Sequence, residues 1–146
     1  MCEVRYLIDT CVISELAKTA PSQRVKAWAA EHDEGSLYLS VLTFFELHKG
    51  IAKQASSKKR ERLHQWVEHD LRERFRNRVL DMDSRVAKVW GEVQGLLEVS
   101  GRPMPAIDSF IAATGVAHDL TVVTRNTAAM KYSGVSLLNP WDDGAR

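Results

Sequence analysis

The feature that most constrains the fold is a series of short apolar runs, each separated from the next by segments with helical spacing. Five runs are too short for helices and are expected to be buried strands: 4–8, 37–39, 79–80, 121–124 and 135–138. Helices are expected over 11–17, from a cap at Ser22 to Gly35, over 41–54, about 58–76, from a cap at Asp83 or Ser84 to Gly101, and over 106–117. This alternation predicts an α/β fold with a central, mostly parallel sheet and helices on both faces.

The length of 146 residues fits one domain spanning residues 1–146. No apolar run approaches the ~20 residues that a membrane-spanning helix needs, and the first residues lack the pattern of a signal peptide. We therefore expect a cytoplasmic protein without a membrane partner. Cys2 and Cys11 have no nearby ligand partners, and we expect neither a disulfide nor a zinc site.

The charge is unevenly distributed, although the net charge is only +1. Residues 53–78 carry nine Lys or Arg against four acids, which leaves the rest of the chain acidic. Such asymmetry fits a polyanionic partner, and it equally fits a solvated helix face or an interface with another protein.

Three acids lie at positions where proteins with an α/β fold commonly carry functional residues. Asp9 ends the first strand, Glu46 lies in a strongly apolar helix, and Asp108 opens a late helix. Each has an ordinary explanation: a helix cap for Asp9, a solvent-facing position for Glu46, and a favourable helix dipole for Asp108.

Taken together, these acids predict a metal site. The carboxyl ends of parallel strands meet at one edge of the sheet, so the three side chains are expected within a few ångströms of one another. Their mutual repulsion requires a cation, and oxygen ligands without His or Cys favour Mg²⁺, or Mn²⁺, over Zn²⁺.

Four segments and the end of the chain resemble the PIN-domain family, and specifically VapC toxins of bacterial toxin–antitoxin pairs. The four segments carry, in order, the Asp-Thr that follows the first strand, the glutamate-bearing helix, the third acidic segment and a Thr-Arg-Asn stretch: 6–16, 40–51, 105–114 and 120–126. The end of the chain, from Gly134 to Trp141, is also similar to VapC-type members. These matches cover nearly the whole chain in order.

The resemblance implies a PIN-like fold and a Mg²⁺-dependent endoribonuclease that a VapB-type antitoxin inhibits. Asp9 and Asp108 would be the principal metal ligands, and Glu46 would bind the metal directly or through water. Thr124 and Asn126 would hydrogen-bond the water shell or a phosphate oxygen.

The resemblance also implies a homodimer that meets operator DNA only through the antitoxin. We expect Trp28 and Trp66 to supply interface anchors, because aromatic side chains are favoured in that role.

One position departs from the family pattern. Members with Thr-Arg-Asn usually carry an Asp three residues after the Asn, and this chain has Ala129 there. The acid was either lost naturally or removed by an introduced substitution. The alternative function is therefore a catalytically weakened PIN module that binds antitoxin or RNA. A phosphoacceptor receiver domain fits less well, because Thr10 rather than a second acid follows Asp9.

Overall fold

The computed structural model describes residues 3–142, and its centre is a five-stranded parallel sheet. The strands are β1 (Tyr6–Ile8), β2 (Leu37–Ser40), β3 (Val79–Leu80), β4 (Thr121–Val123) and β5 (Leu137–Leu138). Their order across the sheet is β3-β2-β1-β4-β5, and every neighbouring pair is parallel. The predicted α/β architecture is confirmed.

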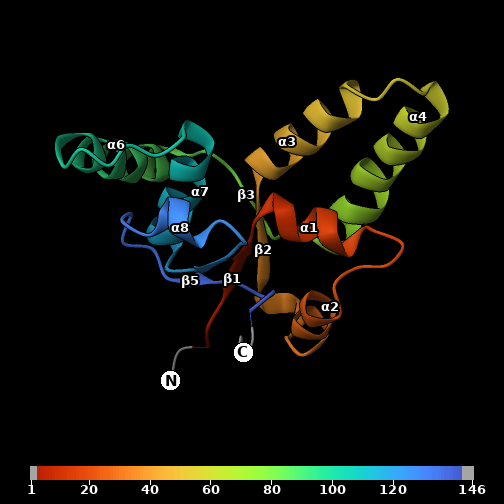
Figure 1. Cartoon of the computed structure of the whole chain (residues 1–146), viewed down its shortest axis with the longest axis horizontal. Coiled ribbons are helices and arrows are strands. Elements are labelled where there is room, and N and C mark those ends of the chain that lie inside the picture. The colour runs from red at the N-terminus through yellow and green to blue at the C-terminus, as the bar shows by residue number, and fades with distance from the viewer. Residues whose placement is uncertain (1–2, 143–146) are drawn as a thin grey trace.

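The helices cover both faces of this sheet (Figure 1). They are α1 (Thr10–Leu16), α2 (Gln23–Ala30), the 3-10 turn η1 (Glu34–Ser36), α3 (Val41–Ala52), α4 (Ser57–Gln65), the π-helical turn η2 (Trp66–Leu71), α5 (Arg72–Arg74), α6 (Ser84–Val99), α7 (Ala106–His118) and α8 (Thr127–Met130). Across residues 3–142, no helix combines the length and apolar character that crossing a bilayer requires.

The strand order creates a switch point between β1 and β4. From β1 the chain builds outward through β2 and β3, then returns to the other side of β1 with β4 and β5. Connections that run in opposite directions leave a crevice at the carboxyl ends of the two strands, where α/β proteins bind ligands. Ile8 pairs with Val123, so the next residues, Asp9 and Thr124, meet at this crevice.

Alternation along the central strands divides the core into two clusters. Tyr6 and Ile8 pack on one face with residues of α1, α2, α3 and η2, whereas Leu7 packs on the other with α6 and α7. On the second face α7 approaches the sheet closely: a Cβ at Gly115 would lie only 2.9 Å from a methyl carbon of Val122 in β4. This contact fixes α7, and therefore the start of α7, relative to the strands.

The helices α3 and α4 project from the body as a hairpin, which we call the arm (Figure 1). Arg60 closes its turn by donating from Nη1 to the carbonyl oxygens of Gln54 (2.6 Å) and Ala55 (3.1 Å). The predicted basic helix is present, but a π-helical turn interrupts it between α4 and α5.

Two expectations on the α2 side were wrong. The second helix ends at Ala30 rather than Gly35, because His32 Nδ1 hydrogen-bonds the Trp28 carbonyl at 2.6 Å and the chain then turns towards β2. Trp28 is not an interface anchor: it is 3% exposed and packs in the core against Tyr6 and His32.

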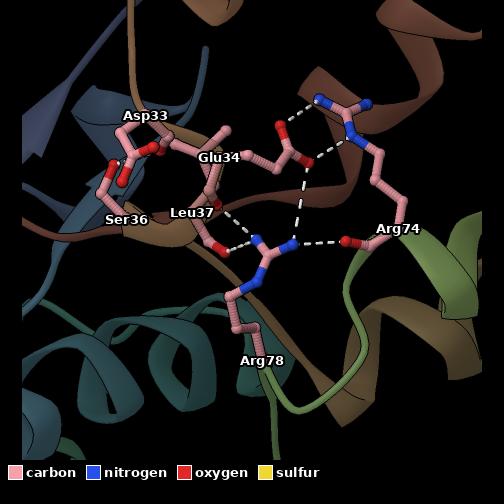
Figure 2. Close-up of polar contacts among 6 residues, drawn as sticks. All are labelled: Asp33, Glu34, Ser36, Leu37, Arg74 and Arg78. Carbon is pink, nitrogen blue, oxygen red and sulfur yellow. Dashed lines mark hydrogen bonds and ion pairs between the residues drawn. The ribbon is translucent and has the colours of Figure 1, made fainter.

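A cluster of charged groups ties the amino ends of β2 and β3 together (Figure 2). Arg78 donates to the carbonyl oxygens of Leu37 (2.6 Å), Glu34 and Arg74, and Arg74 Nε donates to Glu34 Oε1 at 2.6 Å. We call these four residues the Arg78 cluster. It fastens the start of β2 to the turn that follows α5.

Candidate active site

Asp9 and Thr124 form the centre of the crevice. Asp9 is 6% exposed and caps α1, with Oδ1 accepting the Thr10 backbone N–H at 2.9 Å. Its Oδ2 accepts the hydroxyl of the fully buried Thr124 at 2.7 Å. The cap and the ligand roles weighed for Asp9 are therefore compatible, since each carboxylate oxygen has its own donor.

Glu46 reaches the same crevice from the first half of α3. Its Oε1 accepts the Thr10 hydroxyl at 2.6 Å, and that hydroxyl lies 3.2 Å from the hydroxyl of buried Thr43. Burial raises the pKa of Glu46, and the Asp9 and Asp108 charges add to the increase against the opposing Thr10 hydrogen bond. Glu46 is half-buried, so the solvent-facing explanation fails.

Asp108 occupies the first turn of α7 and is also half-buried. Burial raises the pKa of its carboxyl group, and the charge of Asp9 raises it further. The structure therefore brings Asp9, Glu46 and Asp108 near enough to perturb one another, from segments that are far apart in the sequence.

The three acids are not arranged as a complete metal-coordination shell. Among the described residues, no group of three His, Cys, Asp or Glu side chains is already gathered in a metal-binding arrangement. The donor set nevertheless fits Mg²⁺, which takes one or two carboxylates and keeps several of its waters. Burial and the neighbouring negative charges raise the pKa values of Glu46 and Asp108, and a bound cation would oppose both effects.

The remaining predicted residues lie at the rim. The Asn126 backbone N–H donates to Thr124 Oγ1 at 3.0 Å, so Asn126 joins the site through its backbone. Ala129 is exposed on α8. Cys11 lies at the site too, with Sγ 3.7 Å from Asp9 Oδ2, and burial followed by the Asp9 charge raises the pKa of its thiol. Cys2 lies outside the described residues.

Sequence reasoning missed the hydroxyl pair that holds Glu46. Thr10 follows Asp9 directly, and Thr43 precedes Glu46 by one helical turn on α3. The spacing of Thr43 and Glu46 was the available signal, because residues three apart in a helix share a face.

A groove leads away from Glu46 between α1 and the arm. Its first part is a cavity of about 270 Å³ bordered by Thr10, Glu46, Leu63 and Trp66. A second cavity, of about 600 Å³, shares Leu63 and Trp66 with the first and adds Arg62. The space beside Glu46 therefore continues along Leu63 and Trp66 to a second cavity that Arg62 and Asp70 line.

With this geometry established, comparison with known proteins is informative. The family model for the PIN domain matches residues 6–134. The chain belongs to the PIN-domain family. Within it, the chain groups with the VapC and FitB toxins of toxin–antitoxin systems, as the sequence resemblance indicated.

Two curated relatives match over nearly their whole length. The toxin FitB of Neisseria gonorrhoeae is 36% identical over 137 residues, which are 94% of this chain and 99% of FitB. The VapC ribonuclease Y4jK of Sinorhizobium fredii is 34% identical over 136 residues, which are 93% and 97% of the two chains.

The solved structures agree with the sequence comparison. A structure of FitAB bound to an IR36 DNA fragment contains a chain that is 34% identical to this one, with a TM-score of 0.87. The match covers 94% of this chain and 96% of that chain. The PIN-like fold class predicted from the sequence is therefore confirmed.

Proposed function

We propose that this protein is a VapC-type toxin that acts as a Mg²⁺-dependent endoribonuclease. What supports the proposal is that Thr124 holds Asp9 and Thr10 holds Glu46 at the switch point of the sheet, where burial and the charge of Asp9 raise the pKa values of Glu46 and Asp108. The similarity to a protein named a VapC ribonuclease supports the same activity.

Asp9 and Asp108 would hold the metal ion directly, and Glu46 would hold it directly or through a water molecule. An all-oxygen site suits Mg²⁺, and it also suits Mn²⁺. When bound, the ion supplies Lewis-acid polarisation of the phosphoryl oxygen and lowers the pKa of a coordinated water molecule.

The surrounding residues orient these acids. Thr124 donates to Asp9 and accepts from the Asn126 N–H, so its hydroxyl is committed to holding Asp9 in place. Thr10 does the same for Glu46. The Thr10 hydrogen bond fixes the direction of the Glu46 carboxylate, which suits a group that orients the attacking water. The exposed side chain of Asn126 is left to hydrogen-bond a phosphate oxygen.

The partners follow from the toxin family. We propose inhibition by a VapB-type antitoxin, contact with operator DNA only through that antitoxin, and action on RNA in the cytoplasm. The relative solved in the FitAB complex bound to a DNA fragment supports association with an antitoxin and with DNA. We also propose a homodimer, which light scattering at micromolar concentrations tests. The exposed Leu96 and Val99 on α6 favour contact with another protein.

The exposed Ala129 favours the second candidate, a weakened PIN module that binds antitoxin or RNA without efficient cleavage. Incubation of the purified chain with structured RNA in Mg²⁺, in Mn²⁺ and in EDTA separates the two candidates. The first predicts cleavage that requires the ion and disappears in Asp9→Asn. Absence of cleavage in both ions, with RNA still bound, would establish the second.

A further inference from the structure

Thr43 is a buried helical threonine whose hydroxyl does not bond to its own helix. A threonine inside a helix commonly donates to the carbonyl oxygen four residues earlier. Thr114 in α7 does so, with Oγ1 2.9 Å from the Phe110 carbonyl oxygen. Thr43 in α3 is as buried as Thr114, and both are 0% exposed. Within residues 3–142, however, the only hydrogen-bond partner of the Thr43 hydroxyl is Thr10 Oγ1, at 3.2 Å.

The direction of this hydrogen bond follows from the number of protons. The Thr10 hydroxyl has one proton and two neighbours, Glu46 Oε1 at 2.6 Å and Thr43 Oγ1 at 3.2 Å. An ionised carboxylate can only accept, so Thr10 donates to Glu46. Thr43 must then donate to Thr10. The three side chains form a chain of hydrogen bonds that runs in one direction, from Thr43 through Thr10 to Glu46.

This chain determines how the Glu46 carboxylate is presented. Oε1 is occupied by Thr10, whereas Oε2 has no hydrogen-bond partner within residues 3–142 and is the oxygen left for a metal ion or a water molecule. Asp9 is held in the same manner, because the Thr124 hydroxyl that donates to it also accepts the Asn126 N–H. In both cases the hydroxyl beside the acid is itself fixed by a second donor.

We propose that Thr43 is a positioning residue of the candidate active site. Its hydroxyl orients the Thr10 hydroxyl, and through it the Glu46 carboxylate, without contacting metal or RNA itself. The inference rests on the proposed ribonuclease function, in which Glu46 holds the metal ion directly or through water. It adds the residue that sets the orientation of Glu46.

The first test compares three single variants in the absence of RNA. Thr43→Val replaces the hydroxyl with a methyl group, and Thr43→Ser keeps the hydroxyl. Thr114→Val is the matched control, because it removes a buried helical hydroxyl that bonds to its own helix. Mn²⁺ binding is measured from the EPR signal of the free ion, and melting in EDTA shows that each variant is folded. Thr43→Ala takes the place of Thr43→Val if the valine variant does not fold.

We expect Thr43→Val to bind Mn²⁺ roughly 10- to 100-fold more weakly, which is the usual cost of losing a group that orients a metal ligand. Thr43→Ser and Thr114→Val should bind Mn²⁺ as the unsubstituted protein does. Equal Mn²⁺ affinities in folded Thr43→Val and Thr114→Val would overturn the proposal, and Thr43 would then only fill space in the core. A Thr43→Ser variant as weak as Thr43→Val would overturn it too.

Coupling with Thr10 provides a second test, because Thr43 is proposed to act only through the Thr10 hydroxyl. Thr10→Val interrupts the chain of hydrogen bonds by itself. Adding Thr43→Val to Thr10→Val should therefore leave the Mn²⁺ affinity unchanged, which a double-mutant cycle measures directly. Additive losses in the double variant would show that Thr43 acts by another route, and the proposal would fail.

RNA cleavage separates this proposal from the function on which it rests. At one fixed Mg²⁺ concentration, Thr43→Val should lower kcat for a structured RNA and leave KM unchanged, because Thr43 acts on Glu46 and not on the RNA. If the unsubstituted protein cleaves no RNA, the ribonuclease function fails, and the Mn²⁺ measurements still decide the role of Thr43. If it cleaves RNA, and Thr43→Val retains both its kcat and its Mn²⁺ affinity, only the role of Thr43 is overturned.

Discussion

Two polar clusters lie at opposite ends of the sheet and differ in how their charges are balanced. At the amino ends of β2 and β3, Arg78 and Arg74 meet carbonyl oxygens and the Glu34 carboxylate, so donors and acceptors are matched (Figure 2). At the carboxyl ends of β1 and β4, acids gather beside other acids, and the pKa values of Glu46 and Asp108 are raised.

The difference separates a structural cluster from a functional one. A matched network of hydrogen bonds stabilises the fold, and it leaves no group available for a ligand. A cluster of like charges costs folding free energy, and a bound cation would recover that cost. Unbalanced charge in a crevice, rather than the number of polar residues, is therefore what distinguishes the candidate active site.

The largest effect on stability should follow from breaking the matched cluster. Arg78→Met removes three hydrogen bonds to backbone carbonyls from a side chain that is only 16% exposed. We expect the free energy of unfolding in urea to fall by about 2–3 kcal/mol, because charged donors are lost and carbonyl oxygens lose their partners.

Arg76→Met is the matched control for Arg78→Met. Arg76 is exposed, and its ion pair with Glu73 is long, at 3.8 Å. A surface pair of this kind contributes at most about 1 kcal/mol. Equal losses in the two variants would show that the Arg78 cluster does not stabilise the fold.

Adding an acid should increase the negative charge of the acidic cluster and strengthen its binding of Mg²⁺. Ala129→Asp restores the carboxylate that the family pattern places three residues after Asn126. We expect RNA cleavage to reach half its maximum at about 10–100-fold lower Mg²⁺, as for other groups around a metal centre. In EDTA the melting temperature should fall slightly, because another like charge joins the cluster.

Ala128→Asp adds the same charge one position away on α8, where the side chain is also exposed. It should leave the Mg²⁺ dependence unchanged. If both variants shift that dependence equally, position 129 has no special relation to the site.

Removing an acid should have the smallest effect on stability, and its sign depends on pH. Burial raises the pKa of Glu46, so the folded protein holds the proton more tightly than the unfolded chain. Ionised Glu46 therefore destabilises the metal-free fold, fully at neutral pH. The cost disappears as the pH falls through the raised pKa and below the ordinary glutamate value.

Glu46→Gln should consequently raise the melting temperature in EDTA by at most a few degrees at neutral pH. The difference from the unsubstituted protein should vanish in acid. Glu92→Gln is the control, since Glu92 is 59% exposed and pairs with Lys88. A Glu46→Gln variant that is less stable at neutral pH would contradict the electrostatic cost assigned to this site.

The parts of the fold that depend on local patterns could be predicted from the sequence. Apolar runs located the strands, and good capping residues located helix starts, as at Ser40 and Asp83. The end of α2 was misplaced because a His32 side chain, rather than a glycine, determines it. Trp28 was misassigned because one sequence cannot distinguish an aromatic core residue from an aromatic anchor.

Only part of the candidate site could be predicted from the sequence. Asp9, Glu46 and Asp108 could be chosen because acids at strand ends or in apolar helices are conspicuous. The hydroxyl contacts of Thr10 with Glu46 and of Thr124 with Asp9, and the contact of Arg78 with the Leu37 carbonyl, join residues 36 to 115 positions apart. Such contacts exist only after the sheet has formed, so no local sequence pattern predicts them.

The long separation of Asp9 and Thr124 has a consequence during synthesis. Their hydrogen bond joins residues 115 positions apart, and β4 completes the crevice after most of the chain has been translated. At about 5–20 residues per second, roughly 6–23 s pass between translation of Asp9 and translation of Thr124. A nascent chain therefore carries acids without a site. Under the proposed function, RNA cleavage therefore cannot begin until nearly all of the chain has emerged, which leaves time for an antitoxin to be present first.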